Sequence, residues 1–219
     1  MVELGLHNPL AAALGTSGES ELVLAQQVLA AQPAQSLVIN DRYYGVPALL
    51  VDLPAQDGRH FLVRVKKNLR RRLLEVYPDG RALVEIRAGK QTRLGREILG
   101  RGQRGGRGRV TTVRRWTSLR DWRKYPAAEL LALYGRRWEQ EVFYKERKVD
   151  LRSTPYLRSH TPETAAQEIA ALILAYAVMV DFHALCFAWY CVPGLYRTLD
   201  LPSLDYDVIP EGGGSRIGR

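Results

Sequence analysis

The chain has 219 residues, of which 46% are hydrophobic and 25% are charged, an ordinary composition for a folded soluble protein with a sizeable core. It does not open with a basic leader and an apolar stretch, so we expect a cytoplasmic rather than a secreted protein. The longest apolar stretch, residues 169–180, is too short to cross a bilayer. It predicts a buried core helix, and no membrane partner is expected.

Positive charge is concentrated in one segment. The formal net charge is +9, yet residues 59–124 carry 21 Lys and Arg against 5 Asp and Glu, a net of +16. The flanking parts of the chain are slightly acidic. Such an excess is typical of a surface that binds a polyanion. For the run GRGQRGGRGR within this segment, a solvated arginine-rich loop is the alternative.

The N-terminal residues predict two strands and a helix. Apolar runs at 2–6 and 10–14 suit short strands joined by a turn. A helix should follow, capped by Ser17 or Ser20 and ended by Pro33. Its expected buried face consists of Leu22, Leu24, Ala25, Val28 and Leu29.

A carboxylate follows the next apolar run. Residues 36–40, SLVIN, predict a strand that is buried on both faces, and Asp41 stands where it ends. A carboxylate at this place in an α/β sheet commonly faces a functional crevice. The alternative is that Asp41 only caps a turn. A helix around 46–53 and a strand at 60–68 should follow.

The residue pattern changes after residue 68. Residues 73–90 contain Pro-Asp-Gly between two β-like runs, which predicts a hairpin, and glycine and β-branched residues continue to about residue 115. We therefore expect a small β-rich insertion. Trp116 and Trp122 border it, and core packing is favoured over stacking on an unpaired base.

Good helix formers run from 127 to 148 and include a patterned set of polar residues. On an α-helix the members of this set fall within about 60° of one another. The set consists of Tyr134, Arg137, Glu141 and Lys148. A carboxylate with two cations and a phenol suits a site that holds a metal ion against a phosphate. The alternative is an exposed helix with an i, i+4 charge ladder through Lys145.

A second long helix should start with Thr161 as its cap and Pro162 at its first position. Its expected apolar face consists of Ile169, Leu172, Ile173, Tyr176 and Met179.

The segment YGRRWEQEVFYKERK carries the spacing Tyr-x2-Arg-x3-Glu-x6-Lys. This spacing resembles the signature of the YREK group of bacterial insertion-sequence DDE transposases, as do the flanks KYPAAELLALYGRRWEQE and LRSHTPETAAQEIAALILAYAVM. The resemblance implies an α/β fold with a ribonuclease-H-like mixed sheet, flanking helices and a β-rich insertion before the catalytic-Glu helix. The implied organisation is a partial core at 1–68, the basic insertion at 69–120, C-terminal core helices at 121–192 and a loose tail at 193–219.

The resemblance also implies site residues. Asp41 matches the second catalytic Asp and Glu141 the final catalytic Glu, both as ligands of Mg²⁺ or Mn²⁺. Tyr134, Arg137 and Lys148 match DNA-contacting positions, and Lys145, beside them on the same helix, is expected to bind DNA as well. The implied partners are double-stranded DNA, as transposon ends and target, and a second copy in a homodimeric synaptic complex. The protein would be associated with the nucleoid when bound to DNA.

The family's first catalytic Asp has no counterpart in this sequence, since it should precede residue 2 on a neighbouring strand. We therefore expect a C-terminal part of a transposase that is inactive alone. Two alternatives remain open: a DNA-binding remnant without catalysis, and a metal-dependent nuclease of the same fold without strand transfer.

Overall fold

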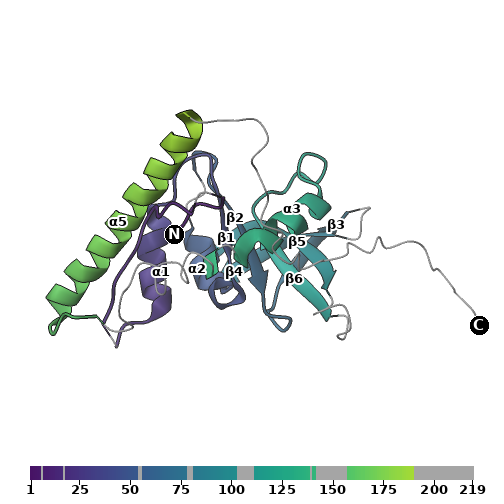
Figure 1. The fold of residues 1–219 in the computed structure, drawn as a ribbon. Helices are drawn as coiled ribbons and strands as arrows, with labels where there is room; N and C mark the ends of the chain where they lie inside the picture. Colours follow the sequence, from purple (N-terminus) through teal and green to yellow (C-terminus); the bar gives the residue numbers. More distant parts are fainter. Residues whose placement is uncertain are drawn as a thin grey trace, which may run out of the picture.

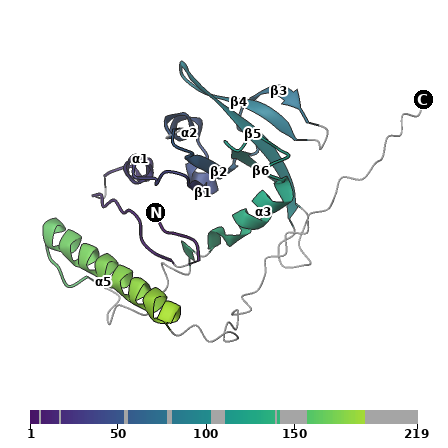
Figure 2. The same cartoon turned by 90° about the horizontal axis from the view of Figure 1, so that it is seen from above.

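The protein is described by a computed structural model that covers residues 1–5, 7–16, 18–53, 56–77, 81–102, 111–138, 140–141 and 157–189. A mixed sheet lies at its centre, with helices against both faces (Figure 1 and Figure 2). The strands are β1 (Leu37–Asn40), β2 (His60–Val65), β3 (Arg72–Val76), β4 (Ala82–Ala88), β5 (Gln91–Gly102) and β6 (Thr111–Thr117). The helices are α1 (Glu21–Ala30), α2 (Pro47–Asp52), α3 (Ala127–Gly135) and α5 (Pro162–Trp189), with 3-10 turns η1 (Arg42–Tyr44) and η3 (Arg136–Trp138).

The sheet order is β1-β2-β6-β5-β4-β3. Strands β1 and β2 pair in parallel, with Leu37 opposite His60, and all other pairs are antiparallel. Parallel neighbours need a crossover connection, which η1 and α2 supply. The predicted mixed α/β architecture is confirmed. Because β6 lies directly beside β2, the predicted core and the predicted β-rich insertion share one sheet, and the boundaries at 69 and 120 stay predictions.

Each face of the sheet has its own apolar core. On one face, Leu49 and Leu50 of α2 pack with Phe61 and Val63 of β2. On the other, Leu62 of β2 packs with residues of α3. Successive side chains of a strand point to opposite faces, so the run FLV in β2 serves both cores. Trp116 lies fully buried in the first core, as predicted.

The N-terminal prediction of two strands is wrong. Only an isolated antiparallel bridge joins Val2 to Pro9. Gly5 and His7 have positive φ values of 98° and 60°, and such residues turn the chain instead of extending it. Pro9 has no N–H with which to continue a ladder.

Helix α1 begins as predicted, with the Ser20 hydroxyl accepting from the Leu22 N–H at 3.3 Å. Of its expected buried face, only Leu29 is buried and the rest are half-buried. Strand β1 is also only half-buried, against the prediction of burial on both faces. Both results follow because β1 is an edge strand of the described sheet and a cavity of about 670 Å³ lies beside it.

Helix α5 begins at Pro162, and Thr161 caps it by accepting from the Thr164 N–H, as predicted. Its predicted burial is wrong: Tyr176 is buried, but Phe182 is 66% exposed and Met179 is exposed too. The helix lies at the end of the molecule opposite β3 (Figure 1 and Figure 2). Only a strip that includes Ile169 and Ile173 lines the cavity beside β1.

Length and composition alone would allow the stretch Pro162–Phe182 of α5 to cross a membrane, since its mean hydropathy is 1.6. This stretch is longer than the apolar run at 169–180, which by itself is too short to cross a bilayer, but a single such helix is weak evidence for a membrane segment.

Candidate functional site

The helix that carries the signature residues changes type in its middle. Helix α3 ends at Gly135, a 3-10 turn spans Arg136–Trp138, and helical structure is present again at residues 140–141. The predicted uninterrupted α-helix is therefore wrong at 136–138. Glycine weakens an α-helix, and helix ends commonly tighten into 3-10 turns. Lys145 and Lys148 lie outside the described residues.

The described signature side chains differ in exposure on the two sides of the 3-10 turn. A 3-10 helix has 3.0 residues per turn instead of 3.6, so positions beyond it are rotated relative to α3. Tyr134 is buried and 5% exposed. The exposed fraction of the side chain rises to 24% at Arg137 and 69% at Glu141. The described signature residues thus run from the core to the surface.

Tyr134 joins α3 to the end of β1. Its hydroxyl donates to the carbonyl oxygen of Asn40 at 3.3 Å, and the Arg115 guanidinium lies 4.6 Å from its ring centroid. Burial raises the pKa of Tyr134 to about 12; Asp41 adds to this effect, while Arg137 opposes it. The phenol therefore stays protonated at neutral pH and can keep donating to the strand end.

Asp41 directly follows β1 and caps η1, since its carboxylate accepts from the Arg42 N–H. The turn-capping alternative is thus observed as a local role. Asp41 is half-buried and, with Arg137, lines the cavity beside β1. Capping occupies only part of the carboxylate, because each carboxylate has about four acceptor positions.

Arg137 interacts with both candidate metal ligands. Its guanidinium donates to Glu141 at 3.1 Å, which is the first pair of the i, i+4 ladder. Burial acts to lower the pKa of Arg137, but Tyr134, Asp41 and Glu141 together raise it. The Arg137 guanidinium therefore interacts electrostatically with Asp41, which follows β1, and with Glu141, which follows η3.

The candidate site has few acidic residues that could bind a metal ion. In the described ranges, no group of three His, Cys, Asp or Glu residues could hold a metal ion. Asp41 and Glu141 are hard oxygen donors of the kind that Mg²⁺ and Mn²⁺ prefer. The buried amide nitrogen of Asn40 has no hydrogen-bond partner, and a rotated amide would present its oxygen instead. These residues fit part of a divalent-cation site, with other positions left to water and phosphate oxygens.

Gly45 sets the position of η1 against β2. A Cβ added at Gly45 would lie 2.2 Å from the backbone oxygen of Arg64. Backbone cannot move aside as a flexible side chain can, so this close approach requires glycine. Sequence reasoning missed Gly45, because its contact partner lies in another element.

We expect Gly45→Ala to lower the free energy of unfolding by about 1–3 kcal/mol, the usual cost of overpacking. Chemical denaturation of the two proteins would measure it. Gly18→Ala is the matched control, because nothing lies within 4 Å of a Cβ there. Equal losses in both variants would show that the close approach to Arg64 carries no special cost.

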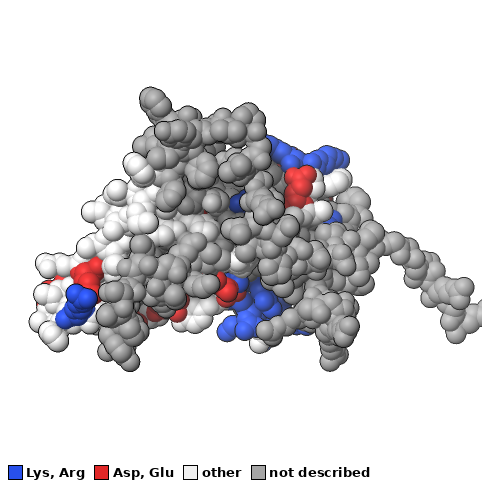
Figure 3. All heavy atoms as spheres, in the orientation of Figure 1, with Lys and Arg blue, Asp and Glu red and all other residues white. Residues whose placement is uncertain are grey.

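Part of the basic segment is internal. Arg96, Arg114 and Arg115 are all buried. The Arg96 guanidinium donates to the carbonyl oxygens of Leu119, Asp121 and Tyr125, and so holds the loop that precedes α3. The face drawn in Figure 3 still shows Lys and Arg side chains gathered over the half of the molecule that holds the sheet. The segment therefore supplies both internal tethers and surface charge.

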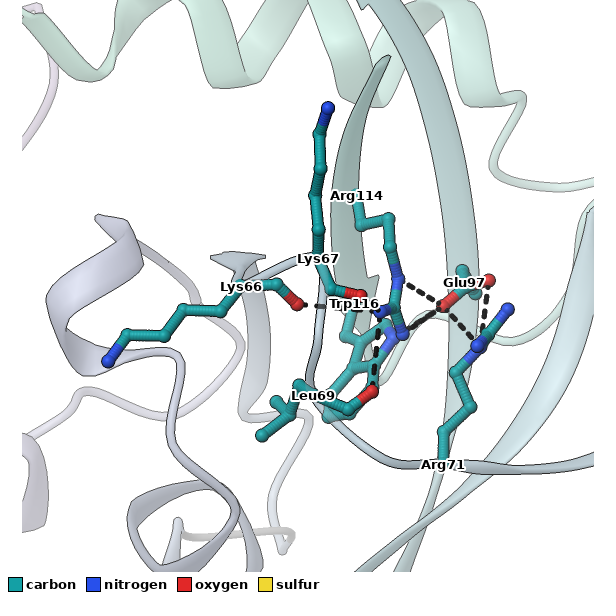
Figure 4. A network of polar contacts seen from close by, with 7 residues as sticks. All are labelled: Lys66, Lys67, Leu69, Arg71, Glu97, Arg114 and Trp116. Carbon is teal, nitrogen blue, oxygen red and sulfur yellow. Dashed lines mark hydrogen bonds and ion pairs between the residues drawn. The ribbon is translucent and has the colours of Figure 1, made fainter.

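Arg114 lies at the centre of a buried polar network (Figure 4). It forms an ion pair with Glu97 at 2.8 Å, and Glu97 also accepts from the Trp116 indole N–H at 3.0 Å. Arg71 reaches the same carboxylate at 2.8 Å. We call these residues, Arg71, Glu97, Arg114 and Trp116, the Glu97 clamp. It joins β5 and β6 to the loop after β2.

Comparison with known proteins identifies the class of protein. A family model described as "Transposase DDE domain" matches residues 1–178. The chain belongs to this family, which confirms the family predicted from the signature residues. It is also 33% identical over 189 residues to the transposase InsG for insertion sequence element IS4 from Escherichia coli (strain K12). That match covers 80% of this chain and 41% of the relative, so the chain spans less than half of the relative's length.

Proposed function

We propose that the chain carries the catalytic region of a DNA transposase that cleaves DNA strands and transfers them at insertion-sequence ends. Family membership supports this, and one geometric observation carries it at the site: Asp41 and Arg137 line the same cavity, and Arg137 donates to Glu141 at 3.1 Å. Carboxylates that converge from a strand end and a helix are the donors expected for phosphodiester chemistry.

We assign Asp41 and Glu141 as the ligands of a divalent cation, Mg²⁺ or Mn²⁺. When bound, such an ion supplies charge neutralisation at a phosphate and lowers the pKa of a bound water. Arg137 balances the two carboxylates in this structure and can donate to a phosphate through its planar fork. Tyr134 is assigned to hold α3 at the strand end beside the DNA, and Lys145 and Lys148 to contact phosphates.

The proposed partners are transposon ends and target DNA, which place the protein in the bacterial cytoplasm, at the nucleoid when bound. Joining two ends would require a homodimer. A non-catalytic DNA-binding remnant is the second candidate. It is favoured by one observation: within the described part of the chain, no third acidic residue, His or Cys joins Asp41 and Glu141 in a metal-binding group.

Nicking by a completed protein tests the proposal. The chain would be extended with upstream sequence to the length of a full transposase and incubated with DNA that carries the insertion-sequence ends. We expect nicking with Mg²⁺ or Mn²⁺ and none with a chelator. Tight DNA binding without nicking under any metal would reject catalysis and favour the remnant.

A further inference from the structure

A second cavity, of about 460 Å³, lies where η1, the loop after β2 and the start of β6 meet. Its lining includes five cationic residues, of which Arg114 belongs to the Glu97 clamp. The other four are Arg42, Arg64, Lys66 and Lys67, and Asn68 and Thr112 also line the cavity. Among the described residues, no carboxylate and no aromatic ring lines it. We call this cavity the basic pocket.

The four cations other than Arg114 are not neutralised by ion pairs among the described residues. None of them takes part in an ion pair in the portion of the chain that the structure describes. Arg42, Lys66 and Lys67 are exposed and Arg64 is half-buried. A cleft lined by charges of one sign concentrates its electric field and attracts ions of the opposite sign. The arrangement therefore favours an anionic ligand.

The Glu97 clamp holds the lysine loop in place. Nη1 of Arg114 donates to the carbonyl oxygens of Lys67 at 2.6 Å, Leu69 at 3.3 Å and Lys66 at 3.4 Å. The side chains of Lys66 and Lys67 point away from Arg114 (Figure 4). The loop backbone is thus fixed by a buried ion pair while both ammonium groups remain available. Such preorganisation lowers the entropic cost of binding.

The basic pocket borders the candidate metal site. Arg42 follows Asp41 directly, and η1 approaches β2 closely where Gly45 meets the backbone of Arg64. A strand bound in the pocket would therefore continue toward Asp41.

We propose that the basic pocket binds phosphate groups of a DNA strand next to Asp41, without reading its sequence. Several cations spread over two elements suit a chain of phosphates better than a single small anion. The absence of lining aromatic rings and carboxylates leaves little to recognise a base. In naming DNA as the ligand, this inference rests on the proposed function.

Fluorescence anisotropy with a labelled DNA duplex of arbitrary sequence tests the pocket on the 219-residue chain. We expect Lys66→Ala/Lys67→Ala to weaken binding roughly tenfold at about 0.1 M salt. The negative slope of log K against log salt should become less steep by about 2, one for each lost phosphate contact. Lys66→Arg/Lys67→Arg should retain both values. Arg87→Ala/Lys90→Ala is the matched control, because it removes two exposed charges at the β4–β5 turn and should change the slope little.

Equal losses in the lysine and control variants would overturn the proposal, because only net charge would then matter. Absence of duplex binding by the unsubstituted chain would also overturn it. So would saturation of the pocket by inorganic phosphate together with unchanged duplex binding in the lysine variant. Matching thermal unfolding curves would establish that the variants fold, and Lys66→Glu/Lys67→Glu should weaken binding further. The readout is independent of cleavage: a lysine-specific loss in a protein that never nicks DNA supports the pocket and rejects catalysis.

Discussion

Asp41→Asn and Glu141→Gln, made singly in a completed protein, are each expected to reduce metal-dependent DNA cleavage by at least about a hundredfold. Loss of a group that only supports a metal ligand already costs about 10- to 100-fold, so loss of a ligand should cost more. Both substitutions keep the side chain's size and remove one negative charge. DNA affinity should therefore stay the same or rise slightly, since a charge that repels phosphate is lost. Single-turnover nicking and duplex binding would measure the two effects separately.

Glu129→Gln is a matched control for this pair, because Glu129 is exposed in the first turn of α3 and in none of the ion pairs of the described chain. It should leave cleavage nearly unchanged. If either ligand variant kept near-normal cleavage, that residue would have no role as a metal ligand. If both variants lost DNA binding in parallel with cleavage, they would be acting on the fold or the DNA interface instead.

Glu97→Ala is expected to lower the free energy of unfolding by about 3–5 kcal/mol, the usual cost of leaving a buried charge without its partner. Removing the carboxylate leaves Arg114 without its ion pair and the Trp116 indole N–H without its acceptor. It also releases Arg71, which holds the start of the β3 hairpin to β5. Glu97→Gln should cost less, because the amide oxygen can still accept a hydrogen bond. Chemical denaturation of the 219-residue chain would measure both.

Glu85→Ala provides the comparison on the neighbouring strand. Glu85 pairs with Arg72 and Arg87, whose side chains are 71% and 65% exposed, and exposed pairs contribute about 0–1 kcal/mol. A similar loss from both alanine variants would contradict a special role for the Glu97 clamp. A large loss of stability in Glu97→Ala, together with weaker DNA binding of the folded variant without denaturant, would support the role of the clamp in holding the lysine loop.

Local patterns predicted most elements because their causes are local. Ser20 caps α1 through a neighbouring N–H, Pro162 starts α5, and Pro-Asp-Gly separates β3 from β4. Burial was predicted less well. Apolar periodicity shows that α5 has an apolar face, but only the surrounding structure decides what covers that face, and Met179 on it stays exposed.

At the candidate site, too, the sequence predicted local features and missed those that depend on packing. The spacing of the signature residues predicted the family, which is confirmed, and selected Glu141. Asp41, a hundred positions earlier, was selected from its place after the apolar run SLVIN and from the resemblance. The spacing did not reveal the 3-10 turn at Arg136–Trp138, since a turn of that kind depends on how the helix end packs. Whether the two carboxylates bind one ion stays a prediction.

The sequence by itself determined the family, most of the helices and strands after residue 20, and the excess of positive charge at 59–124, because each depends on residue type and spacing. Only the tertiary structure decided which of those cations became tethers and which stayed at the surface. Arg114 is buried because β5 places Glu97 beside it, whereas Lys66 and Lys67 face solvent because Arg114 holds their backbone. Charge on a side chain is a local property, but the partner that neutralises it comes from a distant strand.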